Sequence, residues 1–81
     1  MLGYTKKELD TLTSERLTAL IEYAGGDTHL SRMLGVSPQL VYRWKTNGRI
    51  SKKGVELVRR NGAFPYYFTA PGYLRPDWDE A

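Results

Sequence analysis

The sequence predicts an all-α fold: a small domain of four to five helices that contains a helix-turn-helix and ends in an extended tail rich in aromatic residues and proline. Two observations lead to this prediction. Apolar residues recur at helical spacing on both sides of a glycine, at Leu30, Leu34, Val41 and Trp44, which places one side of each of two short helices in a shared core. Beyond residue 63 the chain holds six of its ten aromatic residues and three of its four prolines, so helix is not expected there.

The turn between the two short helices is the most informative part of the chain. Gly35 lies where the chain reverses, and a residue without a Cβ adopts the left-handed conformation at little cost. Ser37 is the predicted N-cap of the second helix, and Pro38 suits its first position, where no backbone N–H is needed. The pair is expected over residues 27–34 and 38–46, and such a pair is typical of proteins that bind duplex DNA.

The chain ahead of this pair is expected to form helix in two pieces. Thr5 and Glu8 form a capping-box pattern, in which the hydroxyl and the carboxylate satisfy backbone N–H groups, and they predict a short helical turn. Apolar spacing predicts a first long helix over residues 13–23, closed by two glycines. Asp27 or Thr28 is then the N-cap of the next helix.

A further helix is expected after the pair. Ser51 is its predicted N-cap, and it ends near residue 60, before Asn61 and Gly62. Gly54 lies inside this helix, where glycine is unfavourable by about 1 kcal/mol relative to alanine. A close approach to another backbone, or a frayed first turn, would account for it.

Residues 64–81 are predicted to form a tail beyond a helix-turn-helix domain at residues 1–63. Residues 66–69 have strand propensity, which suits an edge strand or an arm. Two roles are open to the aromatic side chains: they form a dimer interface, by strand pairing or ring packing, or they fold back to complete the core. The candidates for the dimer interface are Phe64, Tyr66, Tyr67 and Phe68.

Positive charge is concentrated around the second helix of the pair. The formal net charge of the chain is +3, whereas residues 32–60 carry eight basic residues against Glu56 alone. A local excess of this kind is expected of a phosphate-binding face, and the alternative is a solvated basic surface. The neighbouring helix pair favours phosphate binding.

The outer face of residues 38–46 supplies the candidates for recognising bases. A helix enters the major groove with its N-terminal turns nearest the base edges, where Gln39 can pair with adenine and Arg43 with guanine. A phosphate contact or a free surface charge is the alternative for Arg43, and a plain N-cap for Thr28. The predicted base-reading residues are Ser37, Gln39, Tyr42, Arg43 and Thr46. The predicted phosphate contacts are Thr28, Arg32, Lys45, Arg49, Lys52 and Lys53.

Composition argues against several other classes of protein. The chain has no cysteine and one histidine, which excludes a disulfide framework and a tetrahedral Cys/His zinc site. No second histidine or thiol is present that could act with His29 in nucleophilic catalysis or metal binding. We therefore expect neither an enzyme nor a metal or other cofactor. No apolar run approaches the roughly 20 residues of a membrane span and no signal peptide is evident, so a cytoplasmic protein without a membrane partner is expected.

Three short motifs carry a resemblance to a known family. They are Leu-Gly-Val-Ser at 34–37, Val-Tyr-x-Trp-Lys at 41–45 and Asn-Gly-Arg-Ile-Ser at 47–51. With them, the chain resembles the Cro and YdaS-type regulators of bacteria and their phages over about residues 17–78. The Leu-Arg-Pro-Asp sequence at 74–77 is similar to the ending of many of those proteins. Ser31 stands where the family usually has alanine, and neither the residues before the first long helix nor the aromatic stretch belongs to the pattern.

The resemblance implies a lambda-repressor-like fold and a small transcriptional repressor of the bacterial cytoplasm or nucleoid. Such a protein binds a near-palindromic operator in double-stranded DNA as a homodimer. It equally implies an antitoxin-like regulator, which binds a toxin or other protein partner and autoregulates its operon through the same helix-turn-helix. A DNA-bending accessory factor and an RNA-binding protein are further alternatives.

Overall fold

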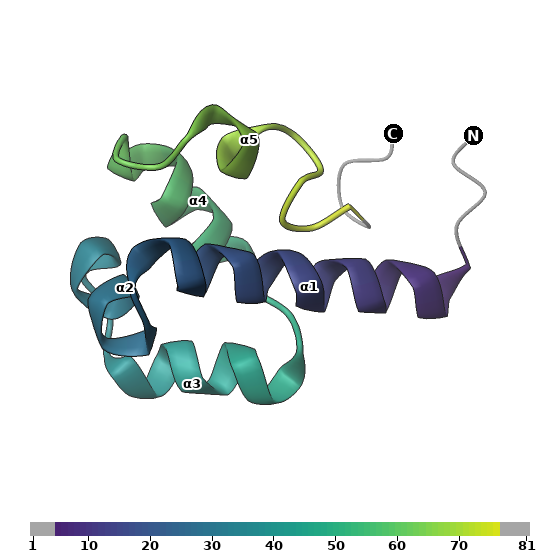
Figure 1. Ribbon diagram of the computed structural model, residues 1–81, viewed down its shortest axis with the longest axis horizontal. Helices are drawn as coiled ribbons and strands as arrows, with labels where there is room; N and C mark the ends of the chain where they lie inside the picture. Colours follow the sequence, from purple (N-terminus) through teal and green to yellow (C-terminus); the bar gives the residue numbers. More distant parts are fainter. Residues whose placement is uncertain (1–4, 77–81) are drawn as a thin grey trace.

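The computed structural model describes residues 5–76, and all of their regular secondary structure is helical, as predicted. The five helices are α1 (Lys6–Ala24), α2 (Asp27–Leu34), α3 (Pro38–Asn47), α4 (Lys52–Asn61) and α5 (Tyr66–Thr69). In Figure 1, α1 crosses the molecule, α3 lies below it with α2 at one end, and α4 and α5 lie above it. In Figure 1, α1 thus lies between α3 and α5.

The helix α1 is continuous, and the prediction of two separate pieces was wrong. The capping box at its start is present: Thr5 Oγ1 accepts a hydrogen bond from the Glu8 N–H at 3.1 Å, and Glu8 Oε1 accepts one from the Thr5 N–H at 2.8 Å. Residues 9–12 contain neither glycine nor proline. Nothing therefore ends the helix before it reaches the buried residues Leu17 and Leu20.

The turn between α2 and α3 has the predicted construction. Gly35 adopts a left-handed conformation with φ of 72°, and the Val36 N–H donates to the Ser31 carbonyl at 2.9 Å. Ser37 is the N-cap of α3, because its Oγ accepts from the Leu40 N–H at 3.2 Å. Pro38 occupies the first turn of the helix. Two short helices thus meet across a tight three-residue turn.

The start of α2 differs from the prediction that Asp27 or Thr28 would cap it. The N-cap is Gly26, no side chain makes the capping hydrogen bond, and Asp27 is the first helical residue. The Asp27 carboxylate turns instead to the ammonium group of Lys45. Ser31 is buried, and its hydroxyl donates to the Thr28 carbonyl at 2.7 Å. A small, internally bonded side chain therefore lies within the helix pair.

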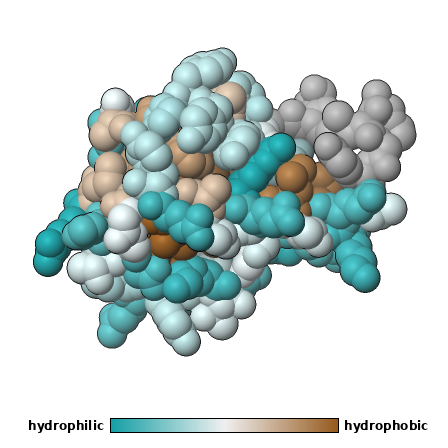
Figure 2. All heavy atoms as spheres, in the orientation of Figure 1, coloured by the Kyte–Doolittle hydropathy of each residue, from teal (hydrophilic) through white to brown (hydrophobic). Residues whose placement is uncertain are grey.

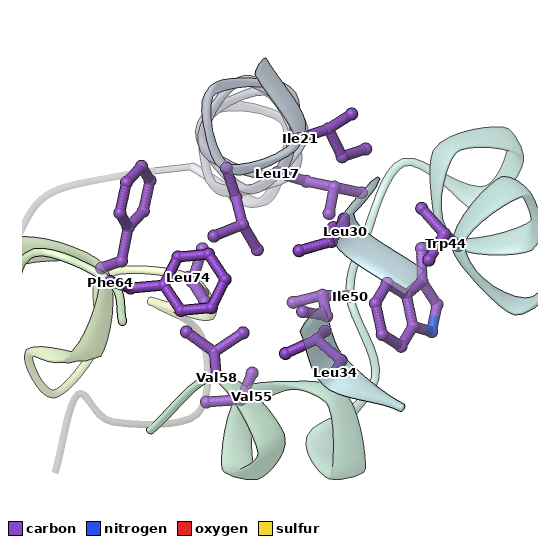
Figure 3. Packing of buried hydrophobic residues seen from close by; sticks show 13 residues of the cluster. Leu17, Ile21, Leu30, Leu34, Trp44, Ile50, Val55, Val58, Phe64 and Leu74 are labelled. Atoms are coloured by element: carbon purple, nitrogen blue, oxygen red, sulfur yellow. The ribbon is translucent and has the colours of Figure 1, made fainter. Parts of the chain in front are cut away.

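One hydrophobic core joins the helices. Figure 3 shows Leu17 and Ile21 of α1 on one side of this core, Val58 of α4 on the other, and Trp44 entering from α3. Its buried members within the described chain are Leu17, Leu20, Ile21, Leu30, Leu34, Val41, Trp44, Ile50, Val55, Val58, Phe64, Phe68 and Leu74. Residues before and after position 63 therefore share a single core.

Gly54 lies in α4 because of a close approach, although side chains rather than backbone make it. A Cβ at this position would come within 2.7 Å of both Ile50 Cγ1 and Trp44 Cζ2. Its N–H donates to the Ser51 hydroxyl at 3.1 Å, so the first turn of α4 is capped as predicted. The glycine makes room for the indole ring.

Residues 66–69 form the short helix α5, so the expectation of a strand and of no helix in this region was wrong. The Phe68 N–H donates to the Pro65 carbonyl at 3.0 Å. Phe68 lies in this helical turn and Phe64 precedes it; both are buried in the core, with their ring centres 6.3 Å apart. The strand propensity of these residues is overridden by this burial. Tyr66 and Tyr67 remain 78% and 50% exposed.

Two arginines fasten the chain after α5 to the rest of the fold. Arg16 Nη1 of α1 donates to the carbonyls of Gly72 and Tyr73, at 3.3 and 2.8 Å, and its guanidinium lies 4.4 Å from the centre of the Tyr73 ring. Arg75 is buried, and its Nη1 donates to the Ile50 carbonyl at 2.9 Å. Asp77 and the rest of the predicted tail lie outside the described residues.

Candidate nucleic-acid interface

Four of the five predicted base-reading residues lie on the outer face of α3, the fifth, Ser37, is its N-cap, and each of the five is exposed. Behind them Val41 is fully buried and Trp44 is 3% exposed, so α3 has one apolar and one polar face, as its spacing predicted. Tyr42 is 64% exposed. The lower edge of the molecule in Figure 2, where α3 lies, is coloured white to teal. The exposed set is Ser37, Gln39, Tyr42, Arg43 and Thr46.

Four of these side chains share a shallow hollow with a residue that the sequence analysis did not single out. Asn47 lines this hollow together with Gln39, Tyr42, Arg43 and Thr46. Asn47 lies one residue beyond the predicted end of this helix, but α3 includes it, and its spacing of four residues from Arg43 places it on the same helix face. An amide at the C-terminal end of α3 extends the row of hydrogen-bonding groups.

Two of the hydroxyls on this face have partners within their own helix. Thr46 Oγ1 donates to the Tyr42 carbonyl at 3.0 Å. Ser37 Oγ accepts from a backbone N–H, as described above, and keeps its own hydrogen free to donate. Gln39 and Arg43 are therefore the residues best supplied with donors for the edges of bases.

The predicted phosphate contacts are all exposed, and they belong to three helices and one turn. Thr28 and Arg32 belong to α2, Lys45 to the last turn of α3, and Arg49 to the turn that follows. Lys52 and Lys53 begin α4. The basic side chains that lie close together in the sequence are therefore exposed on several different elements.

Two of these basic residues are held by carboxylates, which the sequence analysis did not foresee. Lys45 Nζ lies 3.1 Å from Asp27 Oδ2, and Arg49 Nη2 lies 2.9 Å from Asp10 Oδ1. The partners are 18 and 39 residues apart along the chain. Pairs this distant depend on how α1, α2 and α3 pack, and no local spacing reveals them.

The four candidates for a dimer interface divide into two kinds. Phe64 and Phe68 are buried in the chain's own core, whereas Tyr66 and Tyr67 are exposed. The two phenylalanines thus fold back and complete the core, which is one of the two roles considered above. Dimerisation stays a prediction, with only the tyrosines of this set offering surface.

Comparison of the chain with protein-family models, with curated proteins and with solved structures finds no match. Within residues 5–76, no helix has both the length and the apolar character needed to cross a membrane. The same residues contain no cluster of three or more histidine, cysteine, aspartate or glutamate side chains arranged to hold a metal ion. The function of this protein is therefore inferred from the geometry and charge of the surface of its described residues.

Proposed function

We propose that this protein is a transcriptional repressor that recognises a specific sequence in duplex DNA by inserting α3 into the major groove. One observation supports the proposal most directly. Gln39, Tyr42, Arg43 and Thr46 are exposed along α3, as is its N-cap Ser37, while Val41 and Trp44 of the same helix are buried. An α-helix with such an outer face has the width and the hydrogen-bonding groups that the major groove accepts.

Each group on this surface has a distinct part in the proposal. Gln39 pairs with an adenine and Arg43 with a guanine, since an amide and a guanidinium match the donors and acceptors that these bases display. The surrounding basic residues, Arg32, Lys52 and Lys53 among them, neutralise phosphates and position the helix without reading sequence. Bound near a promoter, the protein blocks access of the polymerase.

The proposal includes a second copy of the chain. A single helix of ten residues covers few base pairs, so useful specificity requires two copies on a near-palindromic site, with their α3 helices about 34 Å apart. Of the aromatic candidates for the interface between copies, Tyr66 and Tyr67 have exposed surface.

A second function, binding and neutralising a protein partner while autoregulating through α3, is favoured by a separate observation. Tyr23, Tyr66 and Tyr67 are all about half exposed or more, and α5 lies on the opposite side of α1 from α3 (Figure 1). Tyrosine is enriched at protein interfaces. An identified partner that loses affinity for a Tyr66→Ala, Tyr67→Ala variant but not for Gln39→Ala would establish this function.

Selection of bound fragments from a pool of random duplex DNA tests the leading proposal. The expected result is a consensus with two inverted half-sites whose centres are about 10 base pairs apart. The Gln39→Ala variant, carried through the same selection, is expected to lose its preference at particular positions of each half-site. Sequences that remain random after repeated selection with the folded wild-type protein would refute specific recognition.

A further inference from the structure

Two carboxylates lie among the basic residues of the proposed DNA-binding surface. Asp27, the first residue of α2, bonds the ammonium group of Lys45 through both oxygens, at 3.1 and 3.2 Å. Asp10 of α1 accepts a hydrogen bond of 2.9 Å from Arg49 Nη2. Since Lys45 is in the last turn of α3 and Arg49 follows that helix, both ion pairs lie at its C-terminal end.

These ion pairs are too exposed to contribute much to the stability of the fold. The side chains of Lys45 and Asp27 are 46% and 30% exposed, and those of Arg49 and Asp10 are 45% and 49% exposed. Water and salt screen charges at such positions, and holding two long side chains in place costs conformational entropy. Their main effect is therefore on what else Lys45 and Arg49 can bind.

We propose that Asp10 and Asp27 limit the affinity of this surface for DNA by competing with phosphate for Arg49 and Lys45. The inference rests on the proposed function and concerns the same site. An ammonium or guanidinium group is attracted to a phosphate oxygen by the same charge that holds it to a carboxylate. Binding thus exchanges an intramolecular carboxylate for a DNA phosphate, and each basic residue contributes less than a free one would.

Replacing each aspartate by its uncharged isostere tests this competition. Asp27→Asn and Asp10→Asn are each expected to bind a random duplex about two- to fivefold more tightly, the range that an exposed ion pair allows. Because Lys45 and Arg49 bind phosphate in the wild-type complex as well, the dependence of log K on log salt concentration should change by less than one phosphate contact. Glu22→Gln is the matched control, because Glu22 is an exposed carboxylate in the last turns of α1, and this change should alter the affinity less than either asparagine variant.

A double-mutant cycle separates competition for Lys45 from general repulsion between Asp27 and DNA. In the Lys45→Ala background, Asp27→Asn should no longer increase the affinity, because the carboxylate has no ammonium group to withhold. An undiminished gain in that background would overturn the inference, and so would variants that bind the random duplex no more tightly than the wild type. If wild type and variants alike bind no duplex, the proposed function itself is refuted and the inference falls with it.

Discussion

The outer face of α3 and the segment from Phe64 to Pro76 are both rich in side chains that proteins use to bind partners, yet the structure uses them differently. On α3 the polar and basic side chains point outward while Trp44 is buried behind them. In the C-terminal segment the buried residues include Phe64, Phe68, Leu74 and Arg75, whereas Tyr66 and Tyr67 are exposed. The first region is a surface supported by the core, and the second is largely part of that core.

This difference between the two regions indicates when the sequence alone is sufficient to identify a binding surface. In a helix of ten residues, apolar spacing assigns each side chain to the core or to solvent. In a segment with three prolines and a single four-residue helix, no long periodicity exists, so an aromatic residue can equally be an interface anchor or a core residue. Only the folded chain separates Phe68, which is 2% exposed, from Tyr66 at 78%.

The largest effect is expected from deleting residues 64–81. The deletion removes Phe64, Phe68 and Leu74 from the core. Losing one large core side chain costs about 2–5 kcal/mol, and the loss of three is comparable with the whole stability of a domain, about 5–15 kcal/mol. The truncated chain should therefore be unfolded by circular dichroism and by urea titration. A dimerisation arm would instead leave a folded monomer, and that outcome would contradict the account.

Single substitutions in this segment test the difference between its buried and its exposed side chains. Phe68→Ala should lower the free energy of unfolding by about 3–5 kcal/mol. Tyr66→Ala, two residues away and exposed, should change it by less than about 0.5 kcal/mol. Equal effects of the two changes on the urea midpoint would show that the segment does not pack as described.

The next test concerns Trp44 on the buried side of α3. Trp44→Ala should destabilise the protein by about 3–5 kcal/mol, because the ring is buried and its loss leaves a cavity. Its Nε1 is buried and has no hydrogen-bond partner among the described residues. Thermal melting of this variant beside Tyr42→Ala, which should melt like the wild type, measures the effect. An unchanged melting temperature for Trp44→Ala would reverse the assignment of the two faces.

A smaller effect is expected at the contact between Trp44 and α4. Gly54→Ala should destabilise the fold by about 1–3 kcal/mol, although alanine has the higher helix propensity, because its Cβ would lie 2.7 Å from Ile50 and from the Trp44 ring. Lys53→Ala, the neighbouring exposed position, is the control and should stay within about 0.5 kcal/mol of the wild type. Urea denaturation distinguishes the two, and a stabilised Gly54→Ala variant would show that the ring does not pack there.

Much of the fold could be predicted because its helix ends are encoded locally. The Thr5 capping box, the Ser37 and Ser51 caps and the left-handed Gly35 were each evident in a few adjacent residues. The errors arose where distant contacts decide the outcome. Asp27 was available as a cap but bonds Lys45 instead, and residues 66–69 became helical because that places Phe68 in the core.

The candidate site was predictable to a similar degree and for the same reason. Helical spacing correctly placed Gln39, Tyr42 and Arg43 on the exposed face of α3, and it would have included Asn47 had the helix been extended by one residue. The carboxylates of Asp10 and Asp27 could not be found in this way. Their basic partners approach them only after α1 and α2 have packed against α3.

The most direct test of the central claim compares the Gln39→Ala variant with the wild type. For each protein, the affinity for the selected duplex is divided by the affinity for a random duplex, and the two ratios are compared. Gln39 is uncharged, so its loss leaves phosphate attraction intact. Lys52→Ala, a predicted phosphate contact, should weaken both complexes alike and reduce the salt slope by about one, and Arg60→Ala, an exposed charge in the last turn of α4, should change the ratio little.

If the outer face of α3 reads DNA, Gln39→Ala loses about 1–3 kcal/mol of binding free energy on the selected duplex and almost none on the random one. Equal losses on both duplexes would contradict base recognition by this helix.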